Sequence, residues 1–103
     1  MGRGALRIEE IEEVGIDAEG RIYICPTQTS FDHIYRAAME VYWDKSKRRL
    51  HSPIPRKLSV DQWFSQILAA AVDEYGIQLK LQPSTLWVNV PEEVRSRLQA
   101  TPT

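Results

Sequence analysis

An amphipathic pattern from Ser59 to Gly76 constrains the fold more than any other stretch of the sequence. Ser59 and Gln62 have the spacing of a capping box, which begins a helix, and Gly76 is the residue type that commonly follows a helix end. The pattern predicts a central helix that serves as scaffold. Apolar residues recur at steps of three and one, which places on one side of this helix Val60, Trp63, Phe64, Ile67, Leu68, Ala71, Val72 and Tyr75.

Two β-prone segments precede this helix and are separated by a turn. The run 21–25 is rich in β-branched and aromatic residues and ends at Pro26, as strands often do. Asp17 and Gly20 have the positions that tight turns prefer. Residues 6–16 fit either a strand or a helix, and the turn that follows them favours the strand. The N-terminal part of the chain therefore predicts a β-hairpin.

A second amphipathic pattern covers residues 31–42 and predicts a helix of about three turns. Trp43 lies outside its apolar stripe, so we expect the helix to end near Tyr42. Residues 43–51 fit either a short hairpin with a polar tip or an irregular excursion, and the sequence leaves both open.

Two further strands are predicted after the central helix. Residues 77–81 alternate strictly between apolar and polar, and residues 85–90 form a second β-prone run beyond a turn at Pro83. We expect these segments to pair as a hairpin, followed by a short last helix that begins at Pro91. The apolar side of the second strand is predicted to consist of Leu86, Val88 and Val90.

Helices and hairpins alternate along the chain without the strand–helix–strand rhythm of a parallel sheet. This order predicts an α+β fold, with a mostly antiparallel sheet of hairpins packed on the central amphipathic helix and two further helices. A length of 103 residues suits one domain over residues 1–103, with loose ends at 1–5 and 101–103.

Composition excludes several classes of protein. A hydrophobic fraction of 43% and a net charge of −1 are those of an ordinary globular chain, not of a globally basic nucleic-acid binder. No apolar run approaches the ~20 residues of a membrane-spanning helix. The N-terminus lacks a signal-peptide pattern, and a single cysteine suits a reducing compartment, so we expect a cytoplasmic protein.

The sequence contains no motif of catalysis or metal binding. Cys25, His33 and His51 are single and widely spaced, unlike the clustered ligands of a zinc site. Cys25 also has no basic neighbour that would lower its pKa, so we interpret it as a small hydrophobic residue. We therefore expect a protein that is not an enzyme and that needs no metal and no cofactor.

Charge is divided unevenly along the chain. Residues 1–20 hold two basic and six acidic residues, a net of −4, whereas residues 44–57 hold six basic and one acidic residue, a net of +5. The basic segment fits contact with the phosphates of a nucleic acid or another polyanion, contact with the acidic surface of a second copy, or a solvated loop. The candidate anion-binding residues are Lys45, Lys47, Arg48, Arg49, Arg56 and Lys57.

Aromatic side chains outside the apolar stripes are the second signal. So short a chain cannot cover both faces of its sheet, which favours an interface anchored by aromatic residues. The predicted interface residues are Trp43, Trp87, Tyr42 and Tyr23. An aromatic small-molecule pocket is an alternative, and it would be lined by Tyr23, Tyr35, Trp43 and His51.

Short motifs rich in aromatic residues and proline follow one another between residues 8 and 99: Val41-Tyr42-Trp43-Asp44, Leu50-His51-Ser52-Pro53-Ile54-Pro55, Trp63-Phe64, Tyr75-Gly76 and Trp87-Val88-Asn89-Val90-Pro91-Glu92-Glu93. Their order resembles that of the small proteins encoded in bacterial integron gene cassettes. The resemblance implies a compact α+β protein, often self-associating, with no assigned reaction and no catalytic residues to carry over. The leading hypothesis is a non-catalytic binding protein that forms a homo-oligomer or binds an unidentified protein. Nucleic-acid binding is the alternative.

Overall fold

The computed structural model of the chain describes residues 6–54 and 58–100. The predictions of loose ends at 1–5 and 101–103 lie outside these residues. The elements are, in order, β1 (Arg7–Ile16), β2 (Ile22–Pro26), the 3-10 helix η1 (Ile34–Arg36), β3 (Tyr42–Asp44), β4 (Arg49–His51), α1 (Val60–Tyr75), β5 (Ile77–Lys80), β6 (Leu86–Val88) and α2 (Glu92–Gln99).

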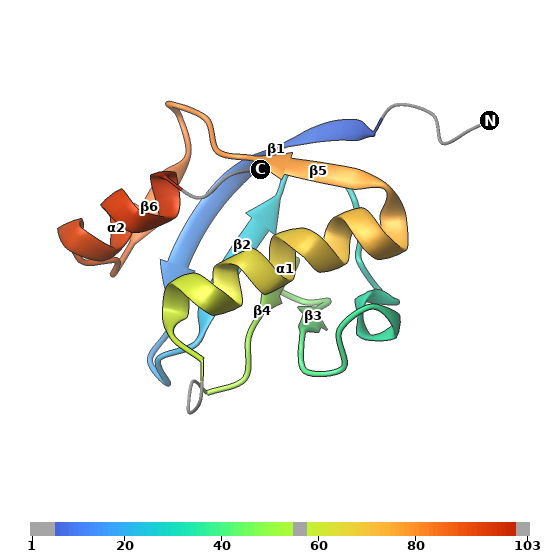
Figure 1. Cartoon of the computed structure of the whole chain (residues 1–103), viewed down its shortest axis with the longest axis horizontal. Coiled ribbons are helices and arrows are strands. Elements are labelled where there is room, and N and C mark those ends of the chain that lie inside the picture. Colours follow the sequence, from blue (N-terminus) through green and yellow to red (C-terminus); the bar gives the residue numbers. More distant parts are fainter. Residues whose placement is uncertain (1–5, 55–57, 101–103) are drawn as a thin grey trace.

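The strands form one six-stranded mixed sheet in the order β3-β4-β2-β1-β5, with β6 also paired to β1 (Figure 1). The pairs β1–β2, β2–β4 and β3–β4 are antiparallel, and β1 pairs with β5 and β6 in parallel. The predicted α+β class is confirmed. The first hairpin is confirmed as β1–β2, and of the alternatives for residues 43–51 the structure has the hairpin, β3–β4.

The predicted hairpin between residues 77–81 and 85–90 is wrong. β5 pairs with the first half of β1 and β6 with its second half, so the chain continues in one direction along the edge of β1 (Figure 1). The Thr85 hydroxyl donates to the Ile11 carbonyl at 2.7 Å and accepts from the Gln82 amide at 2.8 Å. These bonds hold the connecting loop beside the irregularity in β1, where its register against β2 shifts between Ile11 and Glu13. A reversal of the chain there would leave the second half of β1 unpaired on this edge.

Helix α1 begins and ends as its sequence predicts. The Ser59 hydroxyl accepts from the Gln62 amide, the Gln62 side chain accepts from the Ser59 amide, and Gly76 closes the helix with a φ of 64°. Phe64 and Ile67 are fully buried against the sheet, and Ala71 joins them in the core.

The predicted helix over residues 31–42 is wrong, because only η1 forms there. Tyr42 pairs with His51 in the sheet, and the chain must turn before it; the Val41 amide donates to the Ala38 carbonyl at 3.0 Å. Trp43 and Val41 then alternate with the exposed Tyr42, as in a strand. Sheet pairing therefore overrides the helical spacing of this segment.

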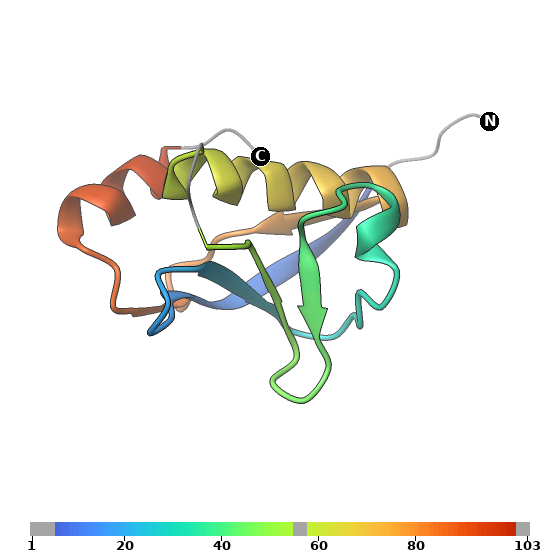
Figure 2. The ribbon, with the colours of Figure 1, turned by 90° about the horizontal axis from the view of Figure 1, so that it is seen from below.

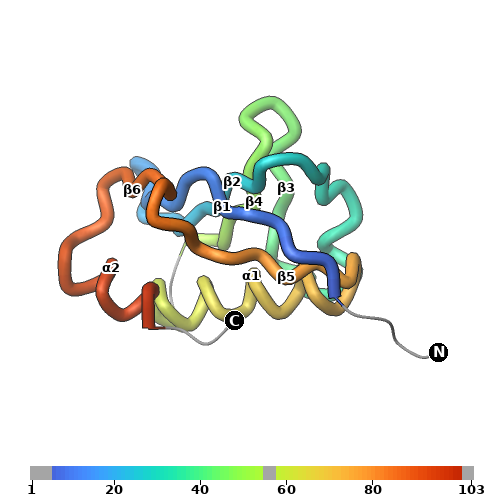
Figure 3. The backbone as a smooth tube through the Cα atoms, turned by 90° about the horizontal axis from the view of Figure 1, so that it is seen from above, coloured from blue at the N-terminus to red at the C-terminus, as the bar shows by residue number. Residues whose placement is uncertain are grey.

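Both α1 and α2 lie on one side of the sheet (Figures 2 and 3). The connection between β3 and β4 extends to the other side, as both views show. Among the described residues no helix covers that second side. We call it the open face.

Candidate interaction surface on the open face

Strand alternation decides which residues lie on the open face. Ile22, Ile24, Val14 and Leu50 are fully buried toward α1, so their neighbours along β1, β2 and β4 point the other way. The register of the sheet places the open-face residues in two rows. One row is Tyr42, His51, Tyr23, Gly15 and Val88; the other is Asp44, Arg49, Cys25, Glu13 and Leu86.

Tyr23 lies across β1 at the centre of the open face. A Cβ at Gly15 would meet the Tyr23 hydroxyl oxygen within 2.3 Å, so the ring rests on the backbone where β1 has no side chain. The hydroxyl donates to Glu13 Oε2 at 2.5 Å. Burial, together with the hydrogen bond to Glu13, raises the pKa of Tyr23 well above its usual value. Tyr23 is therefore a neutral donor held in one position.

Arg49 covers this ring. Its guanidinium carbon lies 3.9 Å from the Tyr23 ring centroid, which is a close cation–π contact. Within the described residues its buried Nε has no hydrogen-bond partner and its guanidinium forms no ion pair. A half-buried cation without a carboxylate is unusual, because desolvation of charge is unfavourable unless the charge is paired.

Cys25 lies between Arg49 and Glu13 in its row and is half-buried. Burial, with a smaller effect of the Glu13 charge, raises the pKa of the thiol to about 11. Arg49 is a basic neighbour that the sequence does not reveal, and its charge lowers the pKa of the thiol, but burial outweighs this effect. The thiol is therefore neutral, like a small hydrophobic residue.

Apolar and aromatic side chains lie at both ends of the first row. The rings of Tyr42 and His51 are 5.4 Å apart, and Tyr42 is 49% exposed. At the other end Val88 is 37% exposed, and Leu86, which ends the second row, is 58% exposed. The prediction that these two residues lie on the buried side of their strand is therefore wrong; Trp87 packs against the core instead.

The tip of the β3–β4 hairpin adds positive charge on the open-face side (Figures 2 and 3). The Asp44 carboxylate accepts from the amides of Ser46 and Lys47 at 3.1 and 3.0 Å and so shapes the turn. The hydrogen bond from the Lys47 amide is the main reason why the pKa of Asp44 is lowered. Lys45 and Lys47 are exposed and form no ion pair with the described residues.

The first half of β1 adds negative charge. Glu10 and Glu12 are exposed and alternate with the buried Glu9 and Ile11, so they point to the open-face side. Glu9 has a structural role, since its carboxylate accepts from the amides of Gln28 and Thr29 at 2.7 and 2.9 Å. Burial alone would raise the pKa of Glu9, but the hydrogen bonds from Thr29 and Gln28 lower it overall.

Of the predicted interface residues, Tyr42 and Tyr23 belong to the open face and the two tryptophans do not. Trp43 packs against Phe31, with ring centroids 5.8 Å apart, and Trp87 lies under Arg95 at 5.2 Å. Both tryptophans are partly buried against the core.

The predicted aromatic pocket does not form from its four residues. Trp43 lies on the α1 side of the sheet, whereas Tyr23 and His51 lie on the open face. Tyr35 is 52% exposed, and its ring lies edge-on to that of His33 instead.

The predicted anion-binding residues are divided. Lys45 and Lys47 form no ion pair with the described residues at the hairpin tip, whereas Arg48 donates to Ser30 Oγ and to the Gln28 carbonyl at 2.9 and 2.8 Å. Arg49 stacks on Tyr23. The remaining two, Arg56 and Lys57, lie outside the described residues.

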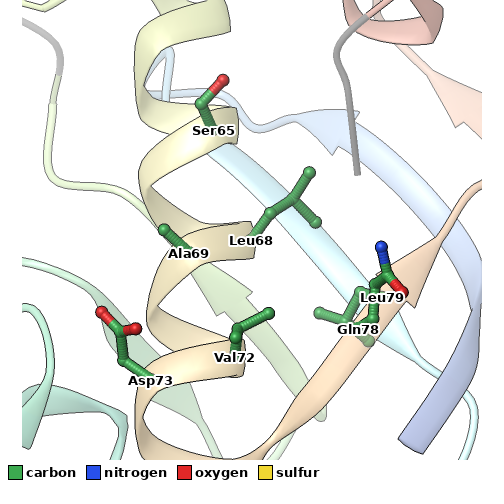
Figure 4. Close-up of a pocket in the computed structure, with 7 residues that line it drawn as sticks. All are labelled: Ser65, Leu68, Ala69, Val72, Asp73, Gln78 and Leu79. Carbon is green, nitrogen blue, oxygen red and sulfur yellow. The ribbon is translucent and has the colours of Figure 1, made fainter. Parts of the chain in front are cut away.

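A groove of about 300 Å³ runs between α1 and β5, and Figure 4 shows its mostly apolar lining. Leu68, Ala69 and Val72 line it from the helix, and Gln78 and Leu79 from β5. In the described part of the chain no three His, Cys, Asp or Glu residues are placed to hold a metal ion. None of the described helices has the length and hydropathy that crossing a bilayer needs.

Comparison with known proteins agrees with the resemblance seen in the sequence. Residues 9–85 match the model of the family Integron Cassette Protein Hfx_Cass5, so the chain belongs to this family. A solved structure of Integron Cassette Protein Hfx_Cass5, from the mobile metagenome of North West Arm Sewage Outfall, is 47% identical in sequence, with 97% of this chain and 95% of that chain covered and a TM-score of 0.45. Comparison with curated proteins gives no match.

Proposed function

We propose that this cassette protein is a non-catalytic interaction protein that self-associates by burying the open face of its sheet between two copies. The observation that carries the proposal is the exposure of Tyr42, Leu86 and Val88 on a face that none of the described helices covers. Antiparallel sheets tolerate one solvated face when that face is polar, but here its ends are aromatic and aliphatic.

Charge supports a second copy as the occupant of this face. Lys45 and Lys47 extend from one part of the open-face side, and Glu10 and Glu12 from another, without ion pairs among the described residues. A self-complementary interface needs both signs on one surface, because a two-fold axis brings each patch against the other.

Light scattering over a range of protein concentrations tests the proposal through paired variants. Val88→Asp and Tyr42→Asp each put a charge on the open face, and we expect each to weaken association by about tenfold or more. Met39→Asp is the matched control, because Met39 is 83% exposed and lies outside the open face. It should leave the association constant unchanged.

The groove of Figure 4 is a second apolar surface through which two copies could associate, and Ala69→Asp tests it by placing a charge there. If Ala69→Asp separates the copies and Val88→Asp does not, association uses the groove and the proposal is wrong. Retention of the wild-type chain on heparin, with no change of mass on dilution, would instead support the polyanion alternative.

A further inference from the structure

The strand order gives the open face an internal symmetry that bears on how two copies meet. Where β6 pairs with β1, the strand order across the sheet is β3-β4-β2-β1-β6, so β2 has two strands on each side. Consider two copies packed face to face about a two-fold axis that runs along β2. The axis then places β4 of each copy over β1 of the other, and β3 over β6.

We propose that the copies pair in this register, with Arg49 of each copy bound to the Glu13 carboxylate of the other. The inference rests on the self-association proposed above and specifies its geometry. Arg49 and Glu13 lie in one row, on opposite sides of Cys25. The axis therefore exchanges their positions and places Cys25 opposite Cys25 of the second copy.

The chemistry of the row supports this pairing. Packing against a second sheet removes water from Arg49, whose Nε is already buried without a partner among the described residues of its own chain. The Glu13 carboxylate accepts from Tyr23 through one oxygen, Oε2, and no hydrogen bond to its other oxygen is formed by the described residues. A guanidinium and a carboxylate so placed match in charge and in planar geometry.

The same axis pairs several other open-face groups by type, although in the second row it places Asp44 opposite Leu86 of the second copy. In the first row Tyr42 lies opposite Val88 of the second copy, so the exposed apolar ends cover each other. Beyond the second row, the hairpin tip of each copy faces the first half of β1 of the other copy. The exposed Lys45 and Lys47 of each copy then lie near Glu10 and Glu12 of the other.

Mixing two single variants tests the register. Arg49→Gln removes the cation, and Glu13→Gln removes the charge but keeps an oxygen that accepts from Tyr23. Each variant alone loses both symmetric contacts, and we expect its association to weaken by about tenfold or more. A mixed pair keeps one intact Arg49–Glu13 contact, so the two variants should bind each other more tightly than either binds itself. Lys47→Gln in place of Arg49→Gln is the matched control and should give a smaller loss.

Cross-linking at exposed positions gives a second test. In a Cys25→Ser background, Lys47→Cys and Glu10→Cys each place a single cysteine at an exposed position. We expect a short bismaleimide to join a mixture of the two variants into a covalent dimer, with less product from either variant alone. If wild-type chains associate but no cross-link forms and the mixture shows no gain, the register is wrong while self-association stands. If the wild-type chain is monomeric at every concentration, both proposals are wrong.

Discussion

Gly15→Ala should destabilise the protein although it adds only one methyl group. The new Cβ would lie 2.3 Å from the Tyr23 hydroxyl oxygen and 2.4 Å from ring carbon Cζ, and Tyr23 is 4% exposed, so the ring must leave its position. Displacement breaks the hydrogen bond to the Glu13 carboxylate, worth ~1.5–3 kcal/mol, and the Arg49 stack, worth ~0.5–1 kcal/mol.

Part of this loss is offset, since alanine lowers the entropy of the unfolded chain by ~0.4–1 kcal/mol relative to glycine. Gly15 is not among the described glycines with positive φ, so alanine meets no backbone strain there. The net expectation is a loss of about 2 kcal/mol in the free energy of unfolding.

Urea denaturation at one fixed, low protein concentration measures this change, since association would otherwise contribute to apparent stability. The control is Gly15→Ala in a Tyr23→Ala background, where no ring opposes the new methyl group. There the same change should be neutral or should stabilise the protein by ~0.4–1 kcal/mol. Equal effects in the two backgrounds would refute the contact between Tyr23 and Gly15 as the cause.

Three further outcomes are expected. Ser59→Ala removes the hydroxyl of the capping box, and the free energy of unfolding should fall by ~1 kcal/mol, measured as a melting temperature lower by ~4–8 °C. Phe64→Ala should lower it by ~3–5 kcal/mol in urea denaturation and Leu68→Ala by less, because Phe64 is fully buried whereas Leu68 lines the groove beside β5; equal losses would contradict the assignment of the core. The lowered pKa of Glu9 means that the folded state binds a proton less readily than the unfolded chain, so stability is present above about pH 4.3 and is lost as the pH falls through the lower folded value. Glu9→Gln should flatten this acid dependence in urea titrations at several pH values. An unchanged slope would argue against the hydrogen bonds that the Gln28 and Thr29 amides and the Thr29 hydroxyl donate to the carboxylate.

Local signals predict the fold well where one element is specified by its own residues. The capping box and Gly76 bound α1 correctly, and the turn at Asp17 and Gly20 gives the first hairpin. The spacing of residues 31–42 predicts a helix wrongly. Tyr42 is extended because it pairs with His51 in the sheet, and the periodicity of one segment carries no information about its strand partner.

The buried and exposed sides of β6 are the opposite of those predicted, and the cause is similar. Leu86 and Val88 alternate as a buried strand would, yet the residue that packs against the core is the intervening, partly buried Trp87. Register against β1 decides the face, and a shift by one residue exchanges the two sides. The open face as a whole is assembled from five strands, so charge and aromatic content predict its residue types but not which of them meet.

Sedimentation equilibrium of the unmodified chain at micromolar concentrations tests self-association most directly. We expect a mass that rises toward twice the 11.9 kDa of one chain as concentration increases and that falls on dilution. Association through exposed aliphatic and aromatic side chains should also persist in high salt, since only the contacts between exposed charges are screened. A mass of one chain at all concentrations and salt conditions would contradict the account.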